Sequence, residues 1–260
     1  MALSFQSDVA VESWGRLRKE AHNIAAPAFA DAFNNGIDEA QRPILACGNR
    51  RSYSDVCLNS GQHLVDMAKL RRFHSFDPDT GLLVADAGVS LADILKHFVP
   101  RGYFLPVTPG TQFVTLGGAV ANDVHGKNHH RAGSFGAHVQ ALTIWRSDRG
   151  IRQVSRSDDP TLFAATIGGM GLTGIILSVA LTLQRVGSAR LDVKTTACPD
   201  FDSLLAGLER DDADHEHNVA WIDCAARGKR LGRGVITAAN WRADGDFGQG
   251  ESGAGPVFPT

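Results

Sequence analysis

The 260-residue sequence predicts an α+β fold, because short helical patterns and many short strand patterns are mixed without a regular alternation of strand and helix. Apolar residues make up 43% of the chain and charged residues 21%, which is enough apolar material for a core and excludes a disordered protein. The most uneven feature is the 28 glycines, since glycine lets the backbone turn sharply and approach a ligand closely. Where these glycines cluster therefore indicates where a binding site is expected.

The predicted elements follow from short apolar runs that are bounded by turn residues. Strands are expected at 43–47, 63–67, 82–89, 174–183, 219–224 and 233–239, with a hairpin turn at 147–150. Helices are expected at 27–33, 90–98 and 202–208, the second with Ser90 as its N-cap. The rest of residues 1–40 is polar with scattered apolar positions, and the glycine-rich end at 245–260 is expected to be loose.

Charge and cysteine usage exclude several classes of protein. The net charge of −2 argues against a nucleic-acid binder that reads only the backbone, and no apolar run is long enough to predict a transmembrane segment. Residues 1–8 lack the basic and apolar regions of a signal peptide, so a cytoplasmic location is expected. None of the 4 cysteines forms a C-x-x-C pair, which argues against a zinc knuckle and favours free thiols.

The strongest candidate site is the glycine-rich segment at 108–136. Successive backbone N–H groups in such turns hold an anion, and a diphosphate is a common ligand. A second loop, Gly48–Asp55, follows a predicted strand and combines a glycine with small polar residues and two cations, Arg50 and Arg51. Two such loops in one chain predict a long ligand with a diphosphate, which means a dinucleotide. For each arginine alone, a solvated surface charge is an equally good interpretation.

Two alternatives were weighed against this interpretation. Residues 169–174 match G-x-G-x-x-G, but a helical pattern precedes them and a strand follows, which is the reverse of the Rossmann order. His125, His129 and His130 with Asp123 could bind a metal, which would indicate a metal-dependent hydrolase. Because H-x-x-x-H on a glycine-rich loop is not arranged in advance as it is on a helix, we expect no metal site.

Several blocks of the sequence together resemble the PCMH-type FAD-binding domain of the vanillyl-alcohol-oxidase superfamily. The similarity is closer to the family of FAD subunits of decaprenylphosphoryl-ribose 2-epimerases, and it extends from Trp14-Gly15-Arg16 to about Ala239. The blocks that carry it are Pro109-Gly110-Thr111, Val114–Ala119, His125-Gly126-Lys127-Asn128-His129-His130, Ala132–Gly136 and Gly168–Ile175. The His-Gly-Lys-Asn-His-His block with its Ala-Gly-Ser-Phe-Gly continuation is the most specific.

The resemblance implies a role for each matching position. The residues expected to bind FAD are Gly48, Asn49, Arg50, Arg51, Ser52, Tyr53, Ser54, Gly110, Thr111, Thr115, Gly117, Gly118, Asn122, Asp123, Gly126 and, through its backbone, Ile175. His125 and Lys127 would be the catalytic residues, and Tyr53, Lys127 and Trp221 would face the substrate. From the residues alone, Trp221 on a strand is more typical of a core residue than of a substrate contact, and Tyr53 also fits simple ring packing.

The implied activity is the oxidation of a secondary hydroxyl of a sugar, or of a lipid-linked polyprenyl-phosphate sugar, by hydride transfer to flavin N5. A nicotinamide-dependent reductase would be the partner for the second half of an epimerisation, and a lipid substrate would bring the protein to a membrane surface. A catalytically silent FAD-binding module or fragment is the alternative. Many superfamily members tether the flavin through a histidine where this chain has Arg51, so FAD is expected to be non-covalent.

The resemblance also implies a division of the chain. Residues 1–185 would form a PCMH-type FAD-binding domain with subdomains at about 1–72 and 73–185. Residues 186–260 would form a partial antiparallel-sheet substrate domain, shorter than the corresponding region of the family.

Overall fold

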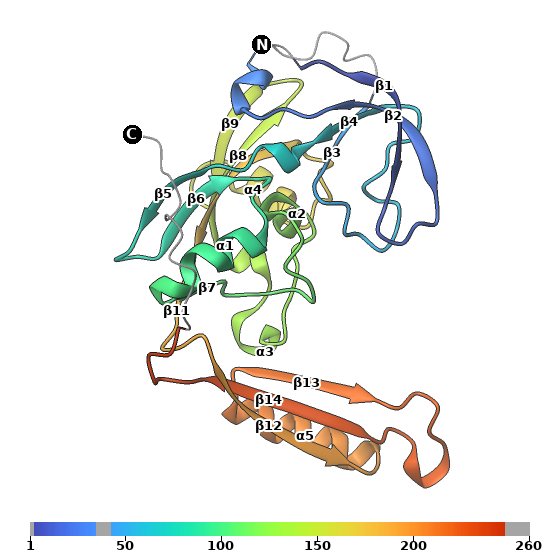
Figure 1. Ribbon diagram of the computed structural model, residues 1–260, viewed down its shortest axis with the longest axis vertical. Helices are drawn as coiled ribbons and strands as arrows, with labels where there is room; N and C mark the ends of the chain where they lie inside the picture. The colour runs from blue at the N-terminus through green and yellow to red at the C-terminus, as the bar shows by residue number, and fades with distance from the viewer. Residues whose placement is uncertain (1–2, 35–42, 248–260) are drawn as a thin grey trace.

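The computed structural model describes residues 3–34 and 43–247, and its first sheet has four strands (Figure 1). Their order is β1 (Gln6–Glu12), β2 (Lys19–Ala25), β4 (His63–Asp66) and β3 (Ile44–Cys47). β1 and β2 form an antiparallel hairpin, whereas β4 runs parallel to both of its neighbours. The loop that leaves β3 therefore begins at the end of a strand that is held in the sheet by β4.

The second sheet has five strands, and every neighbouring pair in it is antiparallel. Their order is β5 (Phe73–Asp77), β6 (Leu82–Asp86), β10 (Ile175–Thr182), β8 (Val139–Arg146) and β9 (Gly150–Ser155). Three helices contribute side chains to its core: α1 (Leu91–Phe98), α2 (Leu116–Ala121) and α4 (Pro160–Thr166). Ser90 and Asp93 form a capping box that starts α1 at the predicted residue.

Smaller elements connect these units. A two-stranded pair joins β7 (Tyr103–Phe104) to β11 (Gln184–Arg185), and α3 is the short helix His129–Ala132. Single 3₁₀ turns lie at Ala30–Phe33, Met67–Lys69, Val99–Arg101, Phe135–His138 and Gly228–Arg230. None of the described helices is long and apolar enough to cross a membrane.

The third sheet lies at the opposite end of the molecule from β1 and β2 (Figure 1). Its order is β12 (Leu191–Cys198), β14 (Gly234–Trp241) and β13 (His217–Ile222), and helix α5 (Phe201–Asp214) packs on one face through Leu204 against Ile236. Val193 and Trp221 point to the other face and are 58% and 68% exposed. This second face therefore has no helix comparable to α5 among the described residues.

The predicted mixture of helices and antiparallel sheets is confirmed. Each predicted strand is present with small changes in its bounds. The strands β1 and β2 were missed because β1 is largely exposed and neither strand has a strong apolar alternation. The predicted helix at 27–33 is only the 3₁₀ turn Ala30–Phe33, whereas the helix expected at 202–208 continues to Asp214 through polar residues that give no stop signal. The prediction for 245–260 lies outside the described residues beyond 247.

Candidate flavin site

The two loops predicted from the glycine pattern lie against each other. A Cβ atom on Gly48 would lie 2.2 Å from Oγ1 of Thr115, so only a glycine permits this approach. The Asn49 side-chain amide donates to the carbonyl of Phe113 at 3.0 Å, and the Arg51 guanidinium lies 5.7 Å from the Phe113 ring. The first loop is thus joined to the second loop by direct contacts between main chain and side chain.

The first loop follows β3, whose last residue, Cys47, is buried. Arg50 has a left-handed backbone (φ 55°), and its guanidinium donates to Oδ2 of Asp66 at 2.5 Å. Tyr53 is 80% exposed, and its ring lies edge-on to Trp14 with 5.2 Å between ring centroids. Burial, assisted by the Asp66 carboxylate, raises the pKa of Cys47 to about 11. This thiol therefore stays protonated at neutral pH and offers no nucleophile.

The start of α2 is fixed by groups of the loop itself. Thr115 caps the helix by accepting from the amide of Gly118 at 3.2 Å, and the amide of Gly117 donates to the carbonyl of Ala87 at 2.8 Å. Gly117 is also buried against Ala87, where a Cβ atom would lie 2.8 Å away. These predicted cofactor positions hold α2 on the end of β6. By contrast, a Cβ atom on Gly110 would meet nothing within 4 Å.

The carboxylate of Asp123 is used within the second loop. One oxygen accepts from the amide of Gly136 at 2.8 Å and the other from the hydroxyl of Ser134 at 2.8 Å. Asp123 also has a left-handed backbone (φ 41°), a conformation in which aspartate is more common than most residues. Neighbouring Asn122 is exposed, but its amide donates back to the carbonyl of Gly118 at 2.8 Å. Both side chains therefore support the loop.

His125 and Lys127 lie on either side of a close backbone contact. A Cβ atom on Gly126 would lie 2.8 Å from the carbonyl oxygen of Thr108, so the main chain at Gly126 packs directly against the main chain at Thr108. His125 forms an isolated β-bridge with Ser134, and the side chains of His125 and Lys127 are both exposed. These two predicted catalytic residues are thus presented to solvent from a fixed backbone.

The same loop contacts the third sheet. The amide of Asn218 on β13 donates to the carbonyl of Lys127 at 2.8 Å, and the Arg131 guanidinium donates to the carbonyl of Asp212 at 3.1 Å. Trp221, three positions further along β13 than Asn218, is exposed on the face of the sheet that α5 leaves uncovered. The structure therefore places the predicted substrate residue on a strand that is bonded to the predicted catalytic loop.

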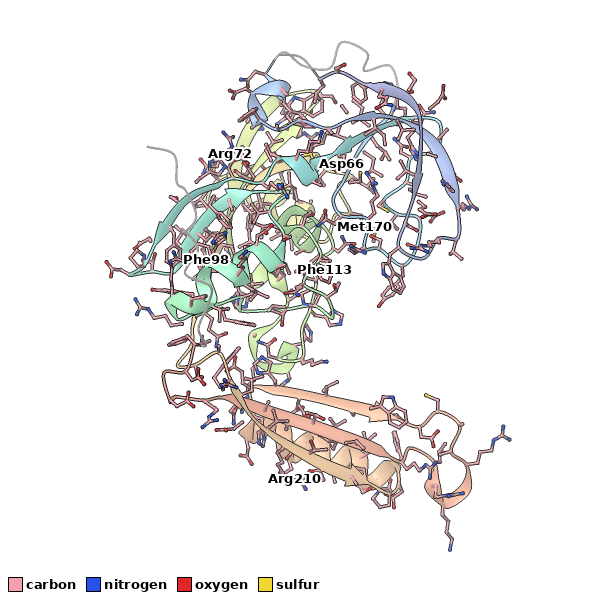
Figure 2. All side chains as sticks on the ribbon, viewed as in Figure 1. Asp66, Arg72, Phe98, Phe113, Met170 and Arg210 are labelled. Atoms are coloured by element: carbon pink, nitrogen blue, oxygen red, sulfur yellow. The ribbon has the colours of Figure 1, made fainter. Side chains whose placement is uncertain are left out.

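A third segment, 168–174, lies beside α2 of the second loop. The amides of Gly168 and Met170 donate to carbonyls of α2, those of Val120 and Ala121, at 3.0 and 2.8 Å. Met170 is 54% exposed and Leu172 is 82% exposed (Figure 2 labels Met170 and Phe113). The sequence argues against a Rossmann motif here, and the order of α4 before the segment and β10 after it confirms this. The sequence predicted no site residue between 168 and 174. The sequence feature that could have identified this segment is its two apolar residues, Met170 and Leu172, placed between glycines.

Ile175, by contrast, is 3% exposed and packs with Trp145 in the core between the first two sheets. Any contact of Ile175 with a ligand would therefore have to come from its backbone, as the resemblance implies.

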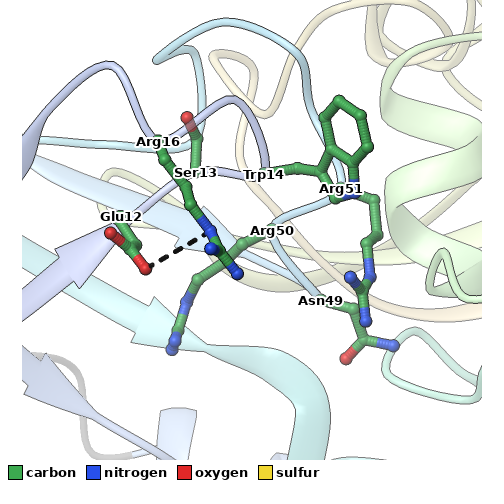
Figure 3. A pocket seen from close by; sticks show the side chains of 7 residues that line it. All are labelled: Glu12, Ser13, Trp14, Arg16, Asn49, Arg50 and Arg51. Atoms are coloured by element: carbon green, nitrogen blue, oxygen red, sulfur yellow. Dashed lines mark ion pairs between the residues drawn. The ribbon is translucent and has the colours of Figure 1, made fainter.

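A cavity of about 500 Å³ lies beside the first loop (Figure 3). Its lining residues come from the β1–β2 hairpin and from the first loop: Glu12, Ser13, Trp14, Arg16, Asn49, Arg50 and Arg51. Glycine again allows the contact between these segments, since a Cβ atom on Gly15 would lie 2.2 Å from the carbonyl oxygen of Tyr53. Trp14 and Arg16 were not predicted as site residues, because the strands that present them were missed.

The histidines do not form a metal centre among the described residues. The rings of His125 and His129 lie 5.7 Å apart between centroids, and His130 instead bonds to the carbonyl of His215 at 3.3 Å. No three His, Cys, Asp or Glu side chains in the described part of the chain come together as a ligand set. The hydrolase alternative therefore lacks the site that it requires.

Comparison with known proteins agrees with this geometry. Residues 33–155 match the family described as FAD binding domain. Over these residues the chain is similar to FAD-binding domains, and this likeness supports FAD as the cofactor. Gly110, which faces open space, and the exposed Phe113 ring and Met170 thioether fit a ligand that combines a diphosphate with a flat apolar ring.

Three relatives extend the comparison beyond the FAD-binding domain. The chain is 36% identical to decaprenylphosphoryl-beta-D-ribose oxidase of Mycolicibacterium smegmatis, over 86% of this chain and 50% of that protein. It is 41% identical to an uncharacterized protein in the mprA 5′ region of Streptomyces coelicolor, over 58% of this chain and 41% of that protein. It is 26% identical to L-gulonolactone oxidase of Mus musculus, over 55% of this chain and 32% of that protein. The chain thus spans half or less of the length of these relatives.

Proposed function

We propose that this chain is an FAD-dependent oxidoreductase that oxidises a secondary hydroxyl of a sugar or of a polyprenyl-phosphate sugar. The observation that carries the proposal is the 36% identity to an oxidase of a decaprenylphosphoryl pentose over 86% of the chain. A match over 86% of the chain extends well beyond the FAD-binding domain at 33–155 and reaches β12, β13 and Trp221. The proposed substrate class rests on this wider likeness.

In this proposal the two loops hold the cofactor between them. The main chain of Gly48–Ser54 and of Gly110 and Thr111 would bind the diphosphate, since a bare amide at a glycine suits an anion and Gly110 faces open space. Phe113 and Met170 would contact the flat ring. Arg51 stands where a tethering histidine occurs in related flavoproteins, and an arginine does not form that bond, so FAD would be dissociable.

The chain's own residues would supply binding, orientation and a proton acceptor. FAD, when bound, supplies an acceptor for the hydride that leaves the substrate carbon. His125 would take the hydroxyl proton, because a base has to lie within hydrogen-bond reach of the group that it deprotonates. Lys127 would orient the substrate by its charge, and Tyr53 and Trp221 would contact the sugar. One C–H and one O–H bond break, and the carbonyl double bond forms.

The finer parts of the proposal concern domains and partners. Residues 1–185 would be the FAD-binding domain with subdomains meeting near residue 72, and the sheet that begins at β12 would belong to a substrate domain from 186 onward. A nicotinamide-dependent reductase would act on the ketone and so complete an epimerisation. A lipid-linked substrate would place the protein at a membrane surface.

The decisive experiment is the visible spectrum of the purified chain before and after acid precipitation, followed by anaerobic mixing with a short-chain polyprenyl-phosphoryl pentose. We expect a yellow protein, release of the colour into the supernatant, and bleaching by the sugar. H125A should slow bleaching by about 10²-fold or more, whereas H129A, its neighbour on the same loop, should have a small effect. A yellow protein that no sugar bleaches would support the silent module, and a colourless one would contradict the proposal.

A further inference from the structure

The cavity between the β1–β2 hairpin and the first loop has an excess of positive charge. Three of its lining side chains are arginines, Arg16, Arg50 and Arg51, and the single carboxylate is that of Glu12. In the view of Figure 3 the Arg16 side chain lies between those of Arg50 and Arg51. A cavity of about 500 Å³ with this lining is large enough for a phosphate group and part of what the phosphate is attached to.

Two of these three charges are poorly compensated by the protein. The nearest carboxylate to Arg16 is Glu12 at 3.9 Å, and the Arg16 side chain is 79% exposed. Arg51 makes no ion pair with a described residue, and its guanidinium lies near the Phe113 ring instead. Only Arg50 has a close partner, Asp66. An anionic ligand would therefore find two guanidinium groups whose donors are available.

The backbone at two of the arginines is unusual for this residue type. Arg16 and Arg50 have φ values of 52° and 55°, in the left-handed region where glycine or asparagine has the lower cost. In a tight turn such as that between β1 and β2, glycine would be easier to place than arginine. That these positions carry long cationic side chains fits a requirement for the guanidinium itself.

An apolar surface adjoins the cations. Trp14 is 55% exposed and lies edge-on to the exposed ring of Tyr53, and Leu17, on the same turn as Arg16, is 78% exposed. A site for a simple anion such as inorganic phosphate does not require this surface. Cations beside exposed tryptophan and leucine fit an amphiphile whose charged group is followed by an apolar chain.

We propose that this cavity binds the phosphate of a lipid-linked substrate, with Arg16 and Arg51 holding the phosphate and with Trp14 and Leu17 contacting the isoprenoid chain. The inference rests on the proposed function and names the part of the substrate that the hairpin recognises. The hairpin residues of this site, Trp14 and Arg16, lie outside the contact between the two loops, which Gly48 and Asn49 make.

The test is equilibrium binding of farnesyl phosphate to the FAD-loaded protein, measured by calorimetry, with farnesol and inorganic phosphate as comparison ligands. We expect farnesyl phosphate to bind more tightly than either. R16Q should weaken its binding about tenfold or more, and R16K should restore part of the affinity. K19Q, which removes an exposed cation at the start of β2 outside the cavity, should leave binding unchanged, and flavin content should be the same in every variant.

Three results would overturn the inference. One is an R16Q variant that binds farnesyl phosphate as the parent protein does. Another is farnesol or inorganic phosphate binding as tightly as farnesyl phosphate, since either would remove the need for one half of the site. The third is loss of FAD from R16Q, which would assign the cavity to the cofactor. Binding requires no turnover, so a protein that oxidises no sugar still answers the question.

Discussion

The two glycine-rich loops meet at one site but use their polar groups in opposite ways. In the second loop the carboxylate of Asp123, the amide of Asn122 and the hydroxyl of Thr115 all bond to main chain or side chains of the same loop. In the first loop Arg51 points into a cavity without a carboxylate partner among the described residues, and Tyr53 is exposed. Thr115, Asn122 and Asp123 therefore form the framework of the second loop, whereas Arg51 and Tyr53 of the first loop are available to a ligand.

This difference separates two kinds of substitution. Changes to Thr115, Asn122 or Asp123 in the second loop should act mainly on folding, because these polar side chains hold the backbone in place. Changes to the outward side chains of the first loop should act mainly on ligand affinity. Gly48 is the exception, because it is the point at which the first loop rests on the second.

The largest effect is expected from G48V. The first side-chain carbon of valine would lie 2.2 Å from Oγ1 of Thr115, so either the cap of α2 or the whole first loop has to move. We expect the free energy of unfolding to fall by about 3 kcal/mol, as for a severely overpacked core position, together with loss of bound FAD. Chemical denaturation of the apoprotein and flavin absorbance measure the two effects.

Gly110 gives the matched control, since a Cβ atom there meets nothing within 4 Å. G110A should change the free energy of unfolding by no more than about 0.5 kcal/mol. Equal destabilisation by G48V and G110A would contradict the direct contact between the loops.

A smaller effect is expected from D123A. The change removes the acceptor of the Gly136 amide and of the Ser134 hydroxyl, and it places alanine at a left-handed position. We expect a loss of about 2 kcal/mol in the free energy of unfolding, because hydrogen bonds to a charged group contribute more than neutral ones. D123N keeps one acceptor and suits the backbone, so it should recover most of the loss. A D123A variant as stable as the parent protein but without bound FAD would show that the carboxylate binds the cofactor. That result would contradict the structural role given to the polar side chains of the second loop.

The sequence predicted the parts of this molecule whose residue types leave few structural choices. Both loops follow from glycines next to small polar residues, and the short strands around them follow from apolar runs such as Ile175–Leu183. Helix α1 begins where Ser90 can cap it. In each case the signal is local, so it can be recognised without knowing which segments lie side by side.

What the sequence did not predict depends on contacts between distant segments. The hairpin of β1 and β2 has few buried positions, so its pattern is weak. Its contacts with Tyr53 and Asp55 bring Trp14 and Arg16 to the first loop. Likewise, no local pattern shows that both carboxylate oxygens of Asp123 accept hydrogen bonds from its own loop, or that Gly117 is buried against Ala87. The roles of individual residues in FAD and substrate binding stay predictions.

The smallest effect concerns the junction between the second loop and the third sheet. His217 is half-buried beside the ring of Trp241, and burial lowers its pKa, an effect that His130 increases and Glu216 opposes. The folded state therefore favours the neutral imidazole, so this contribution to stability is complete above the ordinary histidine pKa and is lost as pH falls below it. Asn218, the next residue, donates its amide to the carbonyl of Lys127.

Acidification should thus lower hydrogen-exchange protection of the Asn218 amide, and H217Q should remove this pH dependence. H97Q, which replaces a histidine on α1 whose pKa is also lowered by burial, should leave it in place. Protection that is independent of pH in the parent protein would show that β13 is held to the loop without His217.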